Sequence, residues 1–179
     1  MTEPNPHNNV SNPSPWIERF ADCIPRGGKV LDLACGGGRH GRYFLRLGHD
    51  TVFVDKNTAA LDDLVAHEHA EIVETDLETD IGWPLGRRSF DAVIVANYLW
   101  RPILPNIVAA IAPGGLLLYE TFALGNEAFG RPRNPDFLLR PGELLDTVRG
   151  RLDVLAYEQI YQDVPSPRVI QHIAARRPL

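Results

Sequence analysis

Residues 30–41 read Val-Leu-Asp-Leu-Ala-Cys-Gly-Gly-Gly-Arg-His-Gly, an apolar run that passes into a cluster of glycines. The apolar residues of 29–34 predict a buried strand, and the periodicity of residues 40–47 predicts a helix. Three glycines between them satisfy the spacing G-x-G-x-x-G: Gly36, Gly38 and Gly41. Glycine allows a tight turn and lets backbone N–H groups approach a ligand closely. The stretch therefore predicts a strand–loop–helix unit that binds a ligand at its loop.

The rest of the chain repeats this alternation of short apolar runs and helical periodicity. Further strands are predicted at residues 50–54, 70–74, 90–96, 116–121, 152–158 and 169–175. Further helices are predicted at residues 16–24, 58–67, 103–112 and 141–150. Strands that alternate with helices indicate a parallel sheet with right-handed crossovers, and the last two strands are expected to form an antiparallel pair. The fold class is therefore α/β.

The length of 179 residues corresponds to one domain. Residues 1–15 are rich in proline and asparagine and bury too little apolar surface to offset the entropy lost on ordering, so they predict a disordered tail. Residues 16–179 are then expected to form the single domain. Ser14 is expected to cap the first helix, with Pro15 at the first helical position.

The composition excludes several classes of protein. The net charge of −5 argues against a general nucleic-acid coat, and no apolar run approaches the roughly 18 residues that span a bilayer. Cys23 and Cys35 form no disulfide framework and lack zinc-ligand partners at the usual spacings, so no metal site is expected. The first residues lack the apolar region of a secretory signal, so a cytoplasmic location is expected.

Two acidic residues indicate what the glycine loop binds. Asp55 ends the second predicted strand, 19 positions after Gly36, where a carboxylate accepts hydrogen bonds from the hydroxyls of a nucleoside ribose. Asp32 lies inside the first strand, where its charge would repel the pyrophosphate of a dinucleotide and attract a cationic ligand. The pair disfavours an NAD-dependent oxidoreductase and favours a nucleoside ligand that carries positive charge.

The pattern Leu-Asp-Leu-Ala-Cys-Gly-Gly-Gly of residues 31–38 resembles motif I of the class I S-adenosylmethionine-dependent methyltransferases, whose cofactor carries a sulfonium and an ammonium group and no phosphate. Later segments resemble the following motifs of that family in the same order: residues 51–55, 74–77, 90–97 and 112–119. The match covers residues 29–119, and residues 31–57 look most like the small tellurite-resistance-type methyltransferases. The resemblance implies a Rossmann-like, doubly wound fold with a seven-stranded, mostly parallel sheet. The implied strand order is 3-2-1-4-5-7-6, with the last strand antiparallel and helices on both faces.

The resemblance also implies S-adenosylmethionine as the cofactor and S-adenosylhomocysteine as the product. The family's acid at the end of the second strand takes both ribose hydroxyls, which assigns that role to Asp55. The third motif binds adenine through an aspartate and the next backbone N–H, here Asp76 and Leu77. The expected cofactor-binding residues are Asp32, Ala34, Gly36, Gly38, Asp55, Lys56, Asp76, Leu77 and Asn97.

Plainer alternatives stay open for several of these residues. The glycines could form only a turn, Asp55 could cap the next helix, and Asp76 could be solvated surface. Cys35 is interpreted as a small core filler because no basic partner is evident. His40 is interpreted as a surface residue at the helix start, although it or Arg39 could lie near the methionine carboxylate.

The segment after the fourth strand is expected to line the space near the transferred methyl group. Tyr98 and Trp100 could hold an electron-rich acceptor or contact the sulfonium by cation–π attraction, and Arg101 could bind an anion. If the acceptor is a hydroxyl or an amine, a general base is expected, and the candidate catalytic residues are Tyr98 and Glu120. A thiolate or a metalloid oxyanion needs no base.

Residues 121–140 contain a connection about twenty residues long, against a usual median of about 4–6. Its three phenylalanines argue against disorder, so we expect a lid over the acceptor pocket, with a loop that merely packs against the sheet edge as the alternative. Residues 55–80 carry nine acids and one base, whereas the rest of the chain carries 14 acids and 17 bases, which leaves an anionic acceptor open. The expected substrate-binding residues are Trp100, Arg101, Asn126, Arg131 and Arg133.

The expected function is transfer of a methyl group to a small or modest-sized nucleophilic acceptor. Little of the chain remains for a separate recognition domain, which favours a small-molecule partner and a monomer or weak dimer. The segment at Asn97 departs from the Asn-Pro-Pro-Tyr pattern of N6-adenine enzymes. An RNA or protein substrate, and a non-catalytic domain that binds S-adenosylmethionine, are the alternatives.

Overall fold

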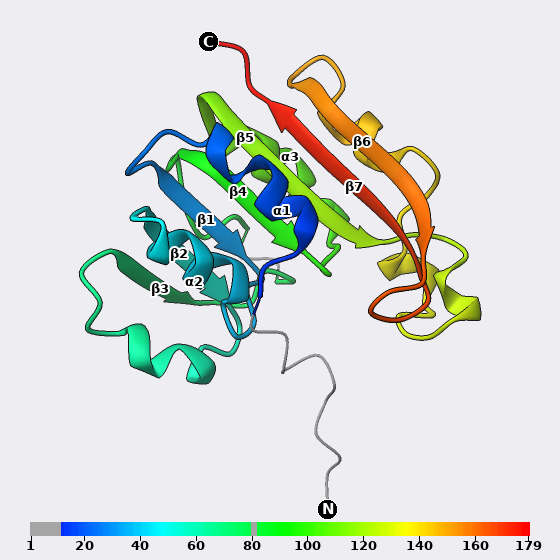
Figure 1. Cartoon of the computed structure of the whole chain (residues 1–179), viewed down its shortest axis with the longest axis horizontal. Helices are drawn as coiled ribbons and strands as arrows, with labels where there is room; N and C mark the ends of the chain where they lie inside the picture. Colours follow the sequence, from blue (N-terminus) through cyan, green and yellow to red (C-terminus); the bar gives the residue numbers. More distant parts are fainter. Residues whose placement is uncertain (1–11, 80–81) are drawn as a thin grey trace, which may run out of the picture.

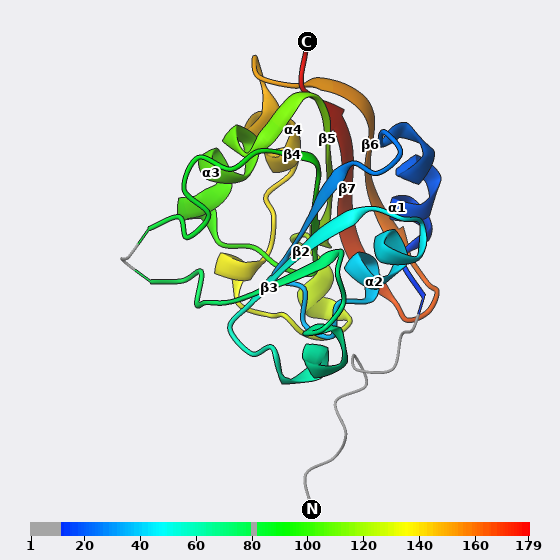
Figure 2. The same cartoon turned by 90° about the vertical axis from the view of Figure 1, so that its left-hand side faces the viewer.

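The computed structural model describes residues 12–79 and 82–179, which form a seven-stranded sheet with helices on both faces (Figure 1; Figure 2). The strand order is β3-β2-β1-β4-β5-β7-β6. The five strands β1 to β5 are all parallel to one another, and β7 is antiparallel to both β5 and β6. This arrangement confirms the expected fold class and strand order.

The strands are β1 Lys29–Leu33, β2 Asp50–Asp55, β3 Ala70–Glu74, β4 Phe90–Ala96, β5 Ile111–Phe122, β6 Asp153–Gln162 and β7 Arg168–Arg176. The α-helices are α1 Pro15–Phe20, α2 Arg39–Arg46, α3 Leu104–Ala109 and α4 Glu143–Val148. The short 3₁₀ helices are η2 Ala21–Cys23, η3 Ala59–Leu64, η4 Arg101–Ile103, η5 Asn126–Ala128 and η6 Pro135–Phe137.

The sheet separates two apolar cores, because successive side chains of a strand point to opposite faces. On β1, Leu31 and Leu33 lie in the core beneath α3 and α4, whereas Val30 packs with Ile17 of α1 and Phe44 of α2. Figure 2 shows the two pairs of helices on opposite sides of the sheet. The central strands are buried on both faces, which explains why their sequences read as continuous apolar runs.

Several predicted boundaries are wrong, mainly at helix ends. The helix predicted at residues 58–67 is only the 3₁₀ helix η3. The helix predicted at 103–112 ends at Ala109, because Ile111 already pairs with Phe90 and begins β5 five residues before the predicted strand. Within residues 12–79 and 82–179, no helix has the length and apolar character needed to cross a membrane.

The boundary predicted for the tail is also wrong at its last residues. Ser14 is 7% exposed, and its hydroxyl both accepts from the Ile17 amide and donates to the Glu120 carboxylate at 2.7 Å. The Ser14 amide donates to the His40 ring at 3.3 Å. The expected cap and the position of Pro15 are confirmed. Residues 1–11 of the predicted tail lie outside the described residues.

Two of the motif glycines serve close packing. A Cβ atom on Gly41 would lie 2.2 Å from the Phe53 ring, and one on Gly38 would lie 2.7 Å from Leu61. Gly36 and Gly37 differ, because a Cβ atom on either would meet nothing within 4 Å. The second half of the motif therefore packs α2 against β2, and the first half faces open space.

Asp32 joins β1 to α2 from beneath the glycine loop. Its carboxylate is 1% exposed and accepts a hydrogen bond of 2.7 Å from the Gly41 amide. Burial raises the pKa of Asp32 to about 7, although the bond from Gly41 and the charge of Arg39 act in the opposite direction. The acid predicted to attract a cationic ligand is thus a buried group that holds β1 to α2.

Gly41→Ala should destabilise the protein by about 1–3 kcal/mol, because the added methyl group overlaps the Phe53 ring and forces the helix away from β2. Denaturant unfolding measures this change. Gly37→Ala is the matched control, since its methyl group meets no atom, and it should shift the free energy of unfolding by less than about 0.5 kcal/mol. Equal stability of the two variants would contradict the packing role of Gly41.

Asp32→Asn replaces the buried carboxyl group with an amide that does not ionise, and it should change how the free energy of unfolding depends on pH. The unfolded carboxyl ionises near its ordinary pKa while the folded one stays protonated up to about 7. The free energy of unfolding of the native protein should therefore fall relative to the variant as pH rises from about 4 to about 7, by at most about 1.4 kcal/mol per pH unit. Parallel stability curves from pH 4 to 8 would show that Asp32 ionises normally.

Candidate functional site

The candidate site lies where the carboxyl ends of the parallel strands meet at one edge of the sheet (Figure 1). Ala34 follows β1, Asp55 ends β2, Asn97 follows β4 and Phe122 ends β5. Two cavities open along this edge, one beside β1 to β3 and one beneath the connection that follows β5.

The first cavity has a volume of about 190 Å³ and contains six of the nine expected cofactor-binding residues. Its lining is Ala34, Asp55, Lys56, Thr75, Asp76, Leu77, Glu78, Asn97 and Tyr98. Sequence reasoning missed Thr75 and Glu78, which flank the predicted adenine-binding pair Asp76 and Leu77. We call this space the cofactor-side cavity.

Asp55 builds one wall of this cavity. One carboxylate oxygen accepts from the Gly36 amide at 2.7 Å, and the other accepts from the Asn57 amide at 3.0 Å. The bond to Asn57 is the local turn contact that the plainer interpretation of Asp55 expected. The bond to Gly36 is different, because it joins the end of β2 to the glycine loop after β1. A carboxylate has about four lone-pair sites, so both oxygens keep capacity for hydroxyl donors.

The backbone at this edge holds an uncommon conformation. Among residues 12–79 and 82–179, the two non-glycine residues with positive φ are Ala34, at 53°, and Asn97, at 55°. Both follow central strands and both line the cofactor-side cavity. Left-handed backbone costs free energy for residues with a side chain and is concentrated at functional sites. The two strained residues mark this edge independently of the glycine motif.

Tyr98 borders the same cavity, and its hydroxyl oxygen is buried without a hydrogen-bond partner among the described residues. Burial raises its pKa, and the carboxylates of Glu78, Asp76 and Asp55 raise it further. A tyrosine with a raised pKa is a poor general base at neutral pH. Its unpaired hydroxyl instead suits a hydrogen bond to a ligand in the cavity.

The second cavity has a volume of about 520 Å³ and lies under the connection after β5. Its lining is Asn97, Phe122, Arg131, Pro132, Arg133, Asn134 and Phe137. Two predicted substrate residues, Arg131 and Arg133, are thus brought to it. Asn97 lines both cavities, so the two spaces meet at the end of β4. We call the larger one the acceptor-side cavity.

The connection that roofs the acceptor-side cavity is an ordered loop. At its base the Leu124 amide donates to the Leu139 carbonyl at 3.0 Å, and the Leu139 amide donates to the Phe122 carbonyl at 2.9 Å. Asn126 is 1% exposed, accepts from the Val169 amide at 3.2 Å and donates to the Pro132 carbonyl at 3.4 Å. Asn126 therefore shapes the loop from inside and does not line the cavity as predicted.

Three other predicted residues also lie away from the two cavities. The Glu120 side chain is buried on the α1 face, bonded to Ser14 and 3.7 Å from Arg39, so it is not placed as a general base. Trp100 packs against the core beneath α3 and α4. The Arg101 guanidinium is bound to Glu143 and to the loop backbone. The residues at the strand ends were predictable from the topology. The pairings of Glu120 with Ser14 and of Arg101 with Glu143 join distant parts of the chain, so no sequence motif indicates them.

Two titratable residues near the glycine loop, Cys35 and His40, have no catalytic setting. Cys35 has its pKa raised by burial and by the charges of Asp32 and Asp55, so its thiol stays protonated. His40 is 3% exposed rather than a surface residue, and burial lowers its pKa to about 3. Among the residues that the structure describes, no group of three or more His, Cys, Asp or Glu side chains could hold a metal ion.

Comparisons with known proteins agree with this geometry. Residues 30–115 match the family model described as a methyltransferase domain. The fold is similar to TehB from Haemophilus influenzae, with a TM-score of 0.76 at 19% identity over 95% of this chain, which spans only 64% of TehB. It is also similar to a TehB-like SAM-dependent methyltransferase from Corynebacterium glutamicum, with a TM-score of 0.64 at 22% identity over 90% of this chain and 86% of that one.

A third similar structure is a complex. It is 1,6-didemethyltoxoflavin-N1-methyltransferase from Burkholderia thailandensis with bound 1,6-didemethyltoxoflavin and S-adenosylhomocysteine, with a TM-score of 0.69 at 19% identity over 92% of this chain and 77% of that one. Comparison with curated protein sequences gives no match. The strand order, the similar solved structures and the match over residues 30–115 together show that the chain has the fold of S-adenosylmethionine-dependent methyltransferases.

Proposed function

We propose that the protein transfers a methyl group from S-adenosylmethionine to a small or modest-sized nucleophilic acceptor held in the acceptor-side cavity. The observation that carries the proposal is the position of Asn97, which lines both cavities at the end of β4. A cofactor in one cavity and an acceptor in the other would meet beside this residue. Bringing two reactants into contact in a fixed geometry is the main contribution of a protein to such a transfer.

The residues of the cofactor-side cavity suit an adenosyl group. In this assignment Asp55 accepts from the ribose hydroxyls, since its oxygens have unused lone pairs. Asp76 and the Leu77 amide take the adenine edge, and the unpaired Tyr98 hydroxyl finds its partner on the cofactor. The open space over Gly36 leaves room for a ligand against the backbone.

The cofactor supplies an electrophilic methyl group on a sulfonium, and the chain supplies orientation and charge. Among the described residues, the lining of the acceptor-side cavity contains two arginines and no carboxylate, histidine or lysine. A base is therefore absent from this lining, which favours an acceptor that arrives as a nucleophile, such as a thiolate or an oxyanion. Arg131 and Arg133 would stabilise its charge by hydrogen bonds.

The size of the cavity favours a small acceptor over a polymer. A volume of about 520 Å³ lies in the range typical of small-molecule sites. The similar enzyme from Burkholderia thailandensis is bound to a small molecule, 1,6-didemethyltoxoflavin. The proposal also includes the expected cytoplasmic location and a monomeric or weakly dimeric state. RNA, a protein substrate and a non-catalytic binding role are the alternatives that the experiments below separate.

Asp55→Ala should weaken binding of S-adenosylmethionine at least about tenfold, because it removes ribose acceptors and the bond that shapes the glycine loop. Isothermal titration calorimetry measures the dissociation constant. Asp62→Ala is the matched control, since it removes an exposed carboxylate from the same acidic segment, and it should change the constant less than about twofold. Unchanged binding by Asp55→Ala would contradict the cofactor assignment.

Substitution of both arginines, Arg131→Gln with Arg133→Gln, should lower kcat/KM for an anionic acceptor by about 10- to 100-fold and leave binding of S-adenosylmethionine unchanged. Release of S-adenosylhomocysteine is measured with a panel of thiols, oxyanions and neutral amines. Turnover of neutral amines alone, or full activity of the double variant, would contradict an anionic acceptor.

RNA binding with a steep salt dependence would favour the polymer alternative, and no turnover with the panel or a cell extract would favour the non-catalytic one.

A further inference from the structure

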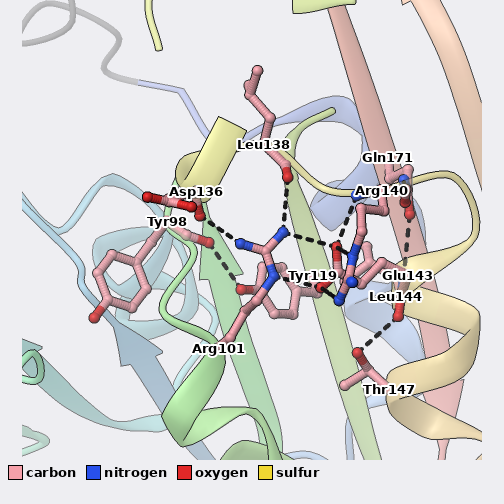
Figure 3. Close-up of polar contacts among 10 residues, drawn as sticks. All are labelled: Tyr98, Arg101, Tyr119, Asp136, Leu138, Arg140, Glu143, Leu144, Thr147 and Gln171. Carbon is pink, nitrogen blue, oxygen red and sulfur yellow. Dashed lines mark hydrogen bonds and ion pairs between the residues drawn. The ribbon is translucent and has the colours of Figure 1, made fainter. Parts of the chain in front are cut away.

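Arg101 forms a bridge between two segments that follow different strands. Its side chain is 30% exposed and lies just after the segment that leaves β4. Its guanidinium donates to both carboxylate oxygens of Glu143, at 2.7 and 2.9 Å, and to two backbone carbonyls of the loop after β5 (Figure 3). These carbonyls belong to Asp136, at 2.6 Å, and Leu138, at 2.9 Å. Four of the five N–H donors of the guanidinium are used by the protein, so Arg101 has little capacity for a substrate anion.

Glu143 is the fixed end of this bridge. Its side chain is 9% exposed, and it also accepts from the Arg140 amide at 2.7 Å. Burial alone would raise its pKa, but the bonds from Arg101 and Arg140 hold the pKa of Glu143 at about 2. The carboxylate is therefore charged at neutral pH. We call Arg101, Glu143 and the two loop carbonyls the Arg101 clasp.

The chain that leads into Arg101 of the clasp lines the cofactor-side cavity. Asn97 and Tyr98 line that cavity, and two residues of chain separate Tyr98 from Arg101. The backbone of Tyr98 is fixed by the buried Tyr119 hydroxyl, which donates to the Tyr98 carbonyl at 2.9 Å. In Figure 3 the Tyr98 ring points away from Arg101 while its carbonyl faces Tyr119. A ligand that contacts the Tyr98 ring therefore acts on a segment with a fixed backbone.

The loop that Arg101 binds lines the acceptor-side cavity. Phe137 lies between the two carbonyls that Arg101 binds and lines that cavity. Arg131 and Arg133 lie on the same loop, a few residues before Asp136. The loop residues near its tip are exposed, so its position depends on contacts at its ends and on its internal bonds.

We propose that Arg101 is a positioning residue that couples the two cavities, so that binding at the cofactor side stabilises the loop over the acceptor side. The inference rests on the proposed function, because it assigns the cofactor to the cavity that Tyr98 borders. The coupling is carried by the rigid segment from Asn97 to Arg101 and by the clasp. Linkage makes the effect reciprocal, so a ligand that favours the closed loop also binds more tightly when the loop is closed.

The sequence supplies a direct probe of loop opening. Trypsin cleaves after lysine and arginine but cleaves poorly before proline. Between residues 102 and 140 the basic residues are Arg131, Arg133 and Arg140, and both Arg131 and Arg140 precede proline. The bond between Arg133 and Asn134 is thus the one susceptible bond of the loop, and its cleavage rate reports how often the loop opens.

The experiment is limited trypsin digestion of the full chain with and without saturating S-adenosylhomocysteine. In the native protein the ligand should slow cleavage after Arg133 by at least about fivefold. Arg101→Met keeps the apolar stem and removes every donor. It should be cleaved at least about tenfold faster, and the ligand should slow it less than about twofold although calorimetry shows that it still binds. Glu143→Gln keeps the packing, should act in the same direction, and serves if Arg101→Met does not fold.

Arg88→Met is the matched control. Arg88 also forms a two-bond pair, with Glu71 at 2.6 Å for each bond, and its side chain is 33% exposed. Neither residue of that pair lines either cavity or contacts the loop after β5, so its loss should leave cleavage after Arg133 and its protection by ligand unchanged. Equal loss of protection in Arg88→Met and Arg101→Met would show a general loss of stability and overturn the inference.

The outcomes separate the inference from the proposed function. Binding of S-adenosylhomocysteine without protection of the native loop, or protection that persists in both Arg101→Met and Glu143→Gln, overturns the coupling and leaves the function intact. No binding to the native protein overturns both. Protection that is present in the native protein and in Arg88→Met, and lost in both clasp variants, supports the coupling.

Discussion

The hydrogen bond of 2.7 Å from the Gly36 amide to the Asp55 carboxylate is the contact on which the site depends. It joins the ends of β1 and β2, so the glycine loop cannot move independently of the acidic wall beside it. Asp32 joins β1 to α2, the two elements that the loop connects, through the Gly41 amide. The loop is therefore held from two sides by carboxylates, and the space over Gly36 stays open. A nucleoside ligand that carries positive charge suits such an electronegative, preformed edge.

The acceptor-side cavity is shaped by a different set of contacts. No single bond shapes it, and the loop after β5 is fixed by contacts at its base, by Asn126 inside and by Arg101 of η4. Its polar lining is basic, in contrast with the carboxylates of the cofactor side. The net charge of −5 is thus the sum of −8 on residues 55–80 (nine acids and one base) and +3 on the rest of the chain (14 acids and 17 bases). It gives no guide to the charge of the acceptor.

The topology and most of the lining of the cofactor-side cavity were predictable from the sequence because they follow from order along the chain. Parallel strands end at one edge, so residues just after them converge there, as Asp55, Asp76 and Asn97 do. Contacts between distant segments carry no such signal, which is why Glu120 and Arg101 were misplaced. Glu120 is 106 positions from its partner Ser14, and Arg101 is 42 from Glu143. Side chains alternate between the two faces along β5, and this alternation places Glu120 on the α1 face. The register of β5 decides which face that is, and the long loop that follows β5 makes this register hard to read from the sequence.

We propose that the cofactor lies in the cavity between Asp55 and Tyr98, with its sulfur toward Asn97 and the acceptor-side cavity. The crystal structure of the complex with S-adenosylhomocysteine tests it most directly. We expect ribose hydroxyls on the Asp55 carboxylate, adenine beside Asp76 and Leu77, and the sulfur facing the space beneath Arg131 and Arg133. A ligand bound at another face, or a sulfur that is closed off from that space, would contradict it.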